Sequence, residues 1–203
     1  MKPPVQPSRR GRWVVLGLGA LILSGFVGSV VLVESGWRPG ATRNYGELVT
    51  PARPVADALL TDLEGRPVRF SAFKGKWTLV YFGRAACAKP CIDNLYKMRQ
   101  ITAAQGREAY RVRQMFIVTD ADTDGMPGVL ADYPATQVLR GSPQAVNELA
   151  AQFALSAGTP LEGLHRVYVV DPLGNFMMSY PADADPRRMH KDLSLLLRVS
   201  YIG

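Results

Sequence analysis

The residues best suited to chemistry in this sequence are its two cysteines, Cys87 and Cys91. They follow an apolar run, Trp77 to Gly83, that is typical of a strand, and they stand at the head of a helical pattern. On a helix, positions i and i+4 share one face, so the two sulfur atoms can meet at one point. That point can be a metal ion or a shared disulfide. Because a first helical turn favours thiolate over thiol, we expect reactive sulfur here.

The chain begins with a segment that predicts a membrane anchor. A basic tail over residues 1–12 carries no acidic residue, and residues 13–33 carry no charge. At 1.5 Å per residue this apolar stretch is about 31 Å long as a helix, close to the hydrocarbon thickness of a bilayer. A cleavable signal peptide is the alternative, although its apolar region is usually shorter, about 7–15 residues. The positive-inside rule keeps the basic tail in the cytoplasm and sends Glu34 onward across the membrane. We expect a single-pass protein of the bacterial inner membrane whose C-terminal domain lies in the periplasm.

The net charge of +7 does not indicate a nucleic-acid partner. Four of the 24 basic residues lie in the N-terminal tail, which leaves 20 basic against 17 acidic residues from Glu34 onward. The densest basic stretch beyond the tail, residues 107–113, carries no nucleic-acid-binding motif, so it indicates a solvated face.

The remaining chain divides into a linker and one domain. Residues 34–54 contain three prolines and no sustained periodicity, which is typical of a linker. Residues 55–203 alternate strand and helix patterns. Strands are expected at 58–61, 67–70, 77–83, 112–119, 136–140, 165–171 and 175–180, and helices after Cys91, near 128–133, at 142–153 and at 186–199. This order predicts an α/β fold with an N-terminal hairpin and a central mixed sheet covered on both faces.

Several segments together match one known pattern. Tyr81-Phe-Gly83 precedes a Cys-x-x-x-Cys motif, and Lys97-Met98 follows it. Further matching segments are Leu60 to Arg66, Phe73 to Trp77, Val118 to Asp124, Gly141 to Pro143 and Val170 to Gly174. These residues resemble the SCO/SenC family of thioredoxin-fold copper proteins. The resemblance covers residues 55–203, and it implies a thioredoxin-like domain behind a single N-terminal anchor.

The resemblance also implies a function and a ligand set. Members of the family deliver copper, or reduce thiols, during maturation of cytochrome c oxidase, and they bind copper with two motif cysteines and one histidine. By position these are Cys87, Cys91 and His165. Thiolates and imidazole suit copper by ligand type alone. The expected partners are an oxidase subunit that accepts copper or carries a disulfide, and other copper chaperones.

The chain departs from the family pattern at two places. Ala88 stands where the family usually has proline, and His165 lies two residues nearer to the turn at Pro172 than the family histidine does. A shift of two residues along a strand keeps a side chain on the same face, so we expect His165 still to point toward the cysteines.

Two mechanisms remain open. As a metallochaperone, the protein would hold Cu(I) with Cys87, Cys91 and His165 and pass it on by ligand exchange. As a thiol–disulfide oxidoreductase, it would attack a partner disulfide with Cys87 and resolve the mixed disulfide with Cys91. Loss of His165 should separate the two mechanisms, because only the first needs the imidazole.

Other polar residues are expected to have structural roles. His190 lies on the inward stripe of the closing helix. Asp120, Asp122 and Asp124 have calcium-loop spacing, but Ala131 occupies the position where an EF-hand needs glutamate, so that motif fails. Solvated loop carboxylates are the favoured interpretation of Asp120 and Asp122; orientation of a ligand near the cysteines is the alternative.

Overall fold

The computed structural model describes residues 9–35, 44–120 and 126–200, and it divides the chain into two units, Met1–Arg43 and Asn44–Gly203. In the first unit, α1 (Arg9–Glu34) is long and apolar enough to cross a membrane by length and composition. The hydroxyls of Ser24 and Ser29 donate to carbonyl oxygens one turn earlier. Both hydroxyls are therefore satisfied within the helix itself, as a hydrocarbon environment requires.

The second unit is built on a six-stranded sheet. Its strands are β1 (Glu47–Pro54), β4 (Trp77–Gly83), β5 (Val112–Val118), β6 (Thr136–Leu139), β7 (Val167–Val170) and β8 (Asn175–Tyr180). The spatial order is β1-β8-β7-β4-β5-β6. Strands β4, β5 and β6 are parallel, and β7, β8 and β1 are antiparallel to their neighbours. The sheet is thus mixed, as predicted.

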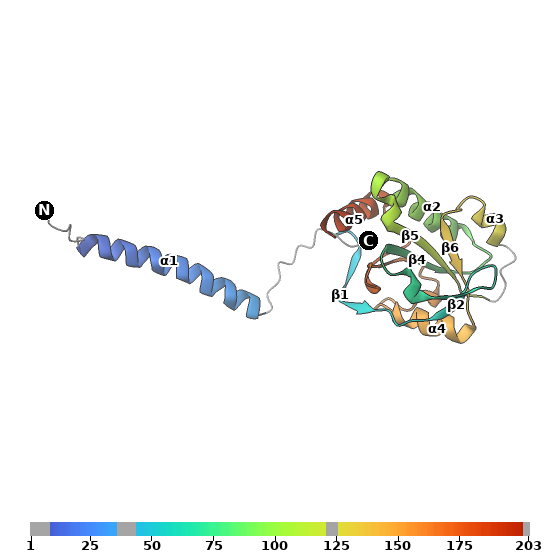
Figure 1. The fold of residues 1–203 in the computed structure, drawn as a ribbon, viewed down its shortest axis with the longest axis horizontal. Coiled ribbons are helices and arrows are strands. Elements are labelled where there is room, and N and C mark those ends of the chain that lie inside the picture. Colours follow the sequence, from blue (N-terminus) through green and yellow to red (C-terminus); the bar gives the residue numbers. More distant parts are fainter. Residues whose placement is uncertain (1–8, 36–43, 121–125, 201–203) are drawn as a thin grey trace. The chain divides into compact units, whose positions relative to one another are not determined.

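Helices cover both faces of this sheet (Figure 1). One face packs against α2 (Lys89–Ala103) and α5 (Pro186–Val199), and the other packs against α4 (Pro143–Gln152). Residues of β4 alternate between the two cores: Leu79 and Tyr81 lie with α2 and α5, while Val80 and Phe82 lie with α4. Because β4 is buried on both faces, its sequence is a continuous apolar run.

Shorter elements complete the domain. They are the hairpin β2 (Leu59–Thr61) and β3 (Pro67–Arg69), α3 (Met126–Leu130), η1 (Phe70–Phe73), η2 (Gly106–Arg111) and η3 (Pro160–Glu162). The hairpin forms where it was predicted. The helix expected at 142–153 also forms as α4, and Ser142 is its N-cap, because the Ser142 hydroxyl oxygen accepts a hydrogen bond from the Ala145 N–H at 3.2 Å. In contrast, α3 ends at Leu130, before the expected end at residue 133.

The stretch expected to be a linker contains a strand of the sheet. β1 pairs with β8, and the compact unit starts at Asn44, upstream of the expected start at Val55. The prolines in this stretch had indicated a linker. However, β1 lies at the edge of the sheet, and its register shifts between Leu48 and Arg53, so the N–H that Pro51 lacks is not needed in the ladder. An edge strand therefore tolerates this sequence.

Candidate functional site

Cys87 and Cys91 form a disulfide at the start of α2, with their Cα atoms 5.3 Å apart. The prediction that both stand on one helical face is wrong. Helix α2 begins at Lys89, so Cys91 lies in its first turn and Cys87 in the preceding loop. Ala88 is the extended N-cap and Pro90 occupies the first turn, a position that proline favours, so the helix starts between the two cysteines. The sulfur atoms meet through this loop geometry.

The two cysteines differ in exposure. Cys91 is buried in the core beside α2, whereas Cys87 is half-buried at the edge of that core. Backbone hydrogen bonds hold the loop tightly: the Cys87 N–H donates to the Ala85 carbonyl oxygen, and the Cys91 N–H donates to that of Ala88. Because Cys87 is the more exposed of the two, a partner thiol or metal would reach Cys87 first.

Asp120 supports the loop that carries Cys87. It follows β5, whose C-terminal end lies beside that of the parallel strand β4. One carboxylate oxygen of Asp120 accepts a hydrogen bond from the Ala85 N–H at 2.9 Å, and the other lies 3.3 Å from the Arg84 guanidinium. Asp120 is therefore not a simply solvated loop carboxylate, because it holds the backbone of the loop that carries Cys87. Asp122 and Asp124 lie outside the described residues.

His165 lies in the segment before β7 and not in the strand. Its φ of 47° is in the left-handed region, where a side chain other than glycine is uncommon. The argument that a two-residue shift keeps the side chain on one strand face therefore does not apply to it. Instead, Nδ1 of His165 lies 2.7 Å from the Tyr81 hydroxyl, and the two rings stack at 17° with centroids 6.4 Å apart.

Tyr81 can fix the tautomer of this histidine. Its ring is fully buried on β4, and this burial raises the pKa of its hydroxyl to about 12, so the phenol stays neutral at ordinary pH. A neutral hydroxyl can accept a hydrogen bond from Nδ1–H, which leaves Nε2 of His165 with a free lone pair. Within the described part of the chain, no hydrogen bond engages Nε2.

Asn94 links His165 to the helix that carries Cys91. It is buried on α2 one turn after Cys91, and its side-chain amide donates to the His165 carbonyl oxygen at 2.8 Å and to that of Pro90 at 3.0 Å. These bonds fix His165 relative to the first turn of α2. In the disulfide form, however, no three His, Cys, Asp or Glu side chains of the described residues are grouped closely enough to hold a metal ion.

Sequence reasoning missed Tyr81 and Asn94 as site residues. Tyr81 sits in an apolar run, where an aromatic residue indicates core packing. Asn94 carried a usable signal, because asparagine is a poor helix former and here stands on the inward stripe of α2 beside Leu95 and Met98. A polar residue on a buried stripe needs a specific hydrogen-bond partner.

Comparison with known proteins places this arrangement in a family. Residues 77–200 match the family model described as the transmembrane-like, thioredoxin-like, C-terminal domain. The chain belongs to this family. Among curated proteins it is similar to the mitochondrial protein SCO2 of Saccharomyces cerevisiae, with 27% identity over 162 residues, which cover 72% of this chain and 52% of the relative. The chain thus spans about half the length of that relative. The expected homology to SCO proteins is confirmed.

Two solved structures show the same thioredoxin-like fold. Yeast Sco1 with copper bound has a TM-score of 0.62 at 19% identity, covering 72% of this chain and 94% of that one. BsSco, described as having a disulfide switch and as a member of the Sco family of cytochrome c oxidase assembly proteins, has a TM-score of 0.58 at 19% identity, covering 74% and 96%. At these identities the likeness establishes the fold.

Proposed function

We propose that this protein is a membrane-anchored copper metallochaperone that assists assembly of cytochrome c oxidase. Copper is its cargo, and Cys87, Cys91 and His165 are its ligands. Two relatives support the proposal: yeast Sco1 has been solved with copper bound, and BsSco belongs to a family of cytochrome c oxidase assembly proteins. The partner would be the oxidase subunit that accepts the copper, and other copper chaperones would supply it.

The observation that carries the proposal is the attachment of His165 to the strand before the cysteine loop and to the helix that carries Cys91. Tyr81 holds its imidazole and Asn94 holds its backbone against the helix of Cys91. Two thiolates and an imidazole form a soft donor set that suits Cu(I). The left-handed backbone at His165 also fits a binding role, because such strained conformations concentrate at ligand sites.

The disulfide and the copper-loaded form would be alternative states of the same cysteine pair. Reduction of the disulfide takes two electrons and two protons from a dithiol, which is oxidised in turn. The thiols must then lose their protons before the sulfur atoms bind a metal, so loading would be pH-dependent. The copper site therefore needs a reductant in its compartment.

The proposed location follows from α1 and the basic tail before it. The helix would hold the protein as a single-pass component of the bacterial inner membrane. The basic tail would remain in the cytoplasm, and the domain with its cysteine pair would stand in the periplasm.

The exposure of the cysteines favours a second candidate function, thiol–disulfide exchange without stable copper binding. In the reduced protein, the half-buried Cys87 thiolate would attack one sulfur of a partner disulfide, form a mixed disulfide and release the other partner thiolate. The buried Cys91 thiolate would then attack the Cys87 sulfur. This step releases the second partner thiol and re-forms the Cys87–Cys91 disulfide.

The test is copper binding by the full chain in detergent micelles, reduced under anaerobic conditions. We expect one Cu(I) per chain, and we expect His165→Ala to weaken the affinity by about 10- to 100-fold. His190→Ala is the matched control, because His190 lies on α5 and contacts Ala104 and Ser194. Absence of bound copper in the wild type with both thiols free would rule out the chaperone function.

A trapping experiment tests the second function. Cys91→Ser should accumulate a mixed disulfide between Cys87 and a disulfide-bearing peptide of the partner subunit, because the resolving thiol is gone. Cys87→Ser should trap far less, since Cys91 is buried. Equal trapping by both variants would contradict the assigned roles.

A further inference from the structure

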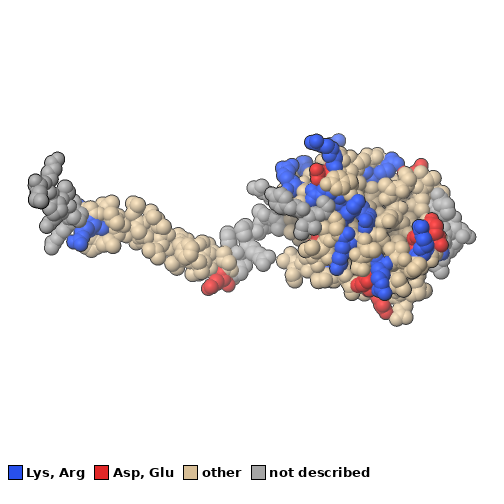
Figure 2. Space-filling model, viewed as in Figure 1, with Lys and Arg blue, Asp and Glu red and all other residues tan. Residues whose placement is uncertain are grey.

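The outward face of α5 combines basic and apolar side chains. Its inward positions Met189, Asp192, Leu193 and Leu197 are buried. The exposed positions are Arg187, Arg188, Lys191, Leu195, Arg198 and Val199. Successive helical residues are about 100° apart, so these exposed residues share one side of the helix. This side, which we call the α5 face, has four cations, two apolar residues and no acidic residue. Figure 2 shows basic side chains gathered over this part of the domain.

The cations of the α5 face are not engaged in ion pairs with described residues. Two of them lie over an aromatic ring at the start of the domain: the Arg188 guanidinium is 5.2 Å and the Lys191 ammonium 6.0 Å from the centroid of Tyr45. Tyr45 is itself half exposed. The surface therefore mixes uncompensated positive charge, aliphatic side chains and a tyrosine, a composition typical of helices that lie at a membrane interface.

The α5 face lies near the point where the chain leads back toward α1. The backbone N–H groups of Tyr45 and Gly46 donate to the buried carboxylate of Asp192 on α5. An extended chain rises by at most about 3.6 Å per residue, so Tyr45 can lie no further than about 40 Å from Glu34 at the end of α1. If α1 spans a bilayer, the α5 face is thus always within reach of the surface of that bilayer. A tether this short gives the α5 face a high effective concentration at the membrane surface.

We propose that the α5 face docks on the anionic phospholipid headgroups of the membrane that holds α1. The proposal rests on the membrane anchoring put forward above. Charge complementarity selects this occupant, since lipid phosphates attract Lys and Arg near the surface while Leu195, Val199 and Tyr45 enter the headgroup region. Docking orients the domain and costs little entropy, because the tether already confines it.

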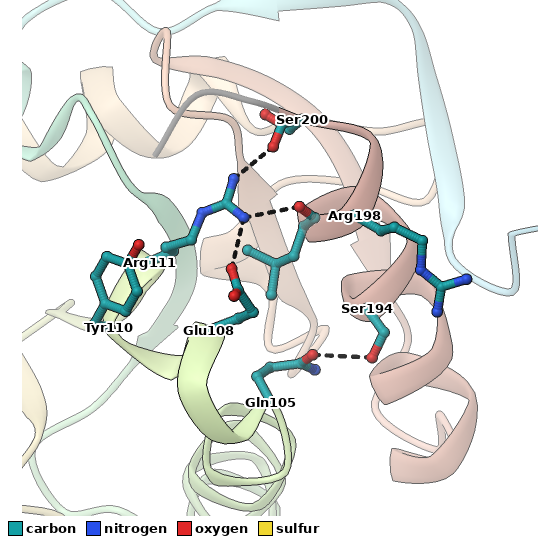
Figure 3. A pocket seen from close by; sticks show the side chains of 8 residues that line it. Gln105, Glu108, Tyr110, Arg111, Ser194, Arg198 and Ser200 are labelled. Atoms are coloured by element: carbon teal, nitrogen blue, oxygen red, sulfur yellow. Dashed lines mark hydrogen bonds and ion pairs between the residues drawn. The ribbon is translucent and has the colours of Figure 1, made fainter.

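The C-terminal end of α5, with Leu195, Arg198 and Val199, lies away from the cysteine pair. Arg111, which directly precedes β5, donates to the carbonyl oxygens of Leu197 and Ser200 and pairs with Glu108, as Figure 3 shows. Because β4 and β5 are parallel, the start of β5 is opposite the strand ends from which the Cys87 loop emerges. The part of the α5 face formed by Leu195, Arg198 and Val199 therefore docks at a distance from the cysteine pair.

A fluorescence experiment on the full chain in vesicles tests the docking. The native cysteines stay in their disulfide, and one fluorophore is attached at Leu195→Cys, with Ala72→Cys in η1 as the control position on the other side of the sheet. The vesicles contain phosphatidylcholine alone or with phosphatidylglycerol, and spin-labelled headgroups act as quenchers. Phosphatidylglycerol should raise quenching at position 195 by about twofold and leave position 72 unchanged, and high salt should remove the rise.

Charge variants complete the test. Arg187→Gln, Lys191→Gln and Arg198→Gln together should abolish the rise in quenching. The matched triple variant Arg69→Gln, Lys74→Gln and Lys76→Gln, near η1, should keep it. Flotation of the chain with the vesicles reports on α1 separately. If the chain floats but quenching at position 195 is equal in both lipids, the docking is overturned and the anchor is not. The docking is also overturned if the triple variant of α5 keeps the rise in quenching with phosphatidylglycerol. A chain that fails to float contradicts the anchor.

Discussion

The Tyr81 hydroxyl and Nδ1 of His165 lie 2.7 Å apart although 84 positions separate the two residues in the sequence. This contact joins the strand that leads to the cysteine loop with the segment that carries the proposed third ligand. It orients the imidazole without using Nε2. The affinity of the site for copper should therefore depend on a residue that cannot itself bind the metal.

Tyr81→Phe is expected to weaken Cu(I) binding by the reduced protein by about 10-fold or more, because a ligand histidine loses the group that orients it. The fold should survive, since one hydrogen bond contributes about 0.5–1.5 kcal/mol. Competition with a Cu(I) chelator measures the affinity. Tyr168→Phe is the control, because the buried Tyr168 hydroxyl has no hydrogen-bond partner among the described residues. Unchanged affinity in Tyr81→Phe would show that the contact is structural only.

The left-handed backbone at His165 predicts a difference between two substitutions that both remove the imidazole. His165→Gly should be more stable than His165→Ala by about 1 kcal/mol, because glycine adopts a φ of 47° without strain. Urea denaturation of the two variants measures this difference. Both should lose tight copper binding. A more stable alanine variant would mean that the residue leaves the left-handed region in solution.

We expect truncation of Asp192 to lower the free energy of unfolding substantially. Its buried carboxylate accepts hydrogen bonds from the Tyr45 and Gly46 N–H groups and from the Tyr180 hydroxyl. Asp192→Ala leaves these donors without an acceptor, so the free energy of unfolding should fall by about 2 kcal/mol or more. Asp192→Asn keeps one acceptor oxygen and should lose less. Denaturant titration ranks the two variants, and equal losses would contradict the role of the acceptor.

The cysteine loop should respond to loss of its support. Asp120→Ala removes the acceptor for the Ala85 N–H, so the loop becomes more mobile and the Cys87–Cys91 disulfide more accessible. We expect a small thiol to reduce the disulfide several-fold faster than in the wild type. This factor corresponds to the loss of one hydrogen bond, which contributes about 0.5–1.5 kcal/mol. Asp120→Asn preserves an acceptor and should stay close to wild type. Rates are followed by mass spectrometry after alkylation, and identical rates in all three proteins would rule out this role.

Alkaline pH should destabilise the domain through its buried tyrosines. Burial raises the pKa of Tyr81 and of Tyr168 to about 12, whereas a tyrosine in the unfolded chain titrates near pH 10. Between these values the folded protein binds more protons than the unfolded chain, so their contribution to stability is complete below about pH 10 and falls as pH rises toward 12. Urea midpoints across this range measure the fall. Tyr168→Phe should reduce it, and an identical pH dependence would exclude Tyr168 as a cause.

Most of the fold followed from local patterns, and the exceptions have physical causes. The apolar run at β4 records burial on both faces of the strand, and the spacing of apolar residues in α5 records which side of that helix is buried. β1 was missed because an edge strand with a broken register tolerates proline, so its sequence resembles a linker. Cys87 was wrongly placed on the same helix as Cys91 because the cysteine spacing fitted a helical face, while Pro90 favours a start of α2 at Lys89.

The chemistry of the site was predictable in part. Residue type and family resemblance gave Cys87, Cys91 and His165 as candidates; the structure joins the two cysteines in a disulfide, and His165 as a ligand stays a prediction. The contacts around His165 were not, because they join β4, α2 and the segment before β7, and no local periodicity records such pairings. The left-handed conformation of His165 was equally hidden, since glycine or asparagine is the usual signal for it.

The attachment of the Tyr45 and Gly46 backbone to Asp192 also has a mechanical consequence. If α1 is held in a membrane as proposed, any force carried along the chain from it enters the domain at this attachment and at the start of β1. From there it passes into α5 and, through β8, into the rest of the sheet. The loop of Cys87 follows β4, and β8 and β7 lie between β4 and β1 in the sheet, so two strands separate the point where the force enters from the sulfur pair.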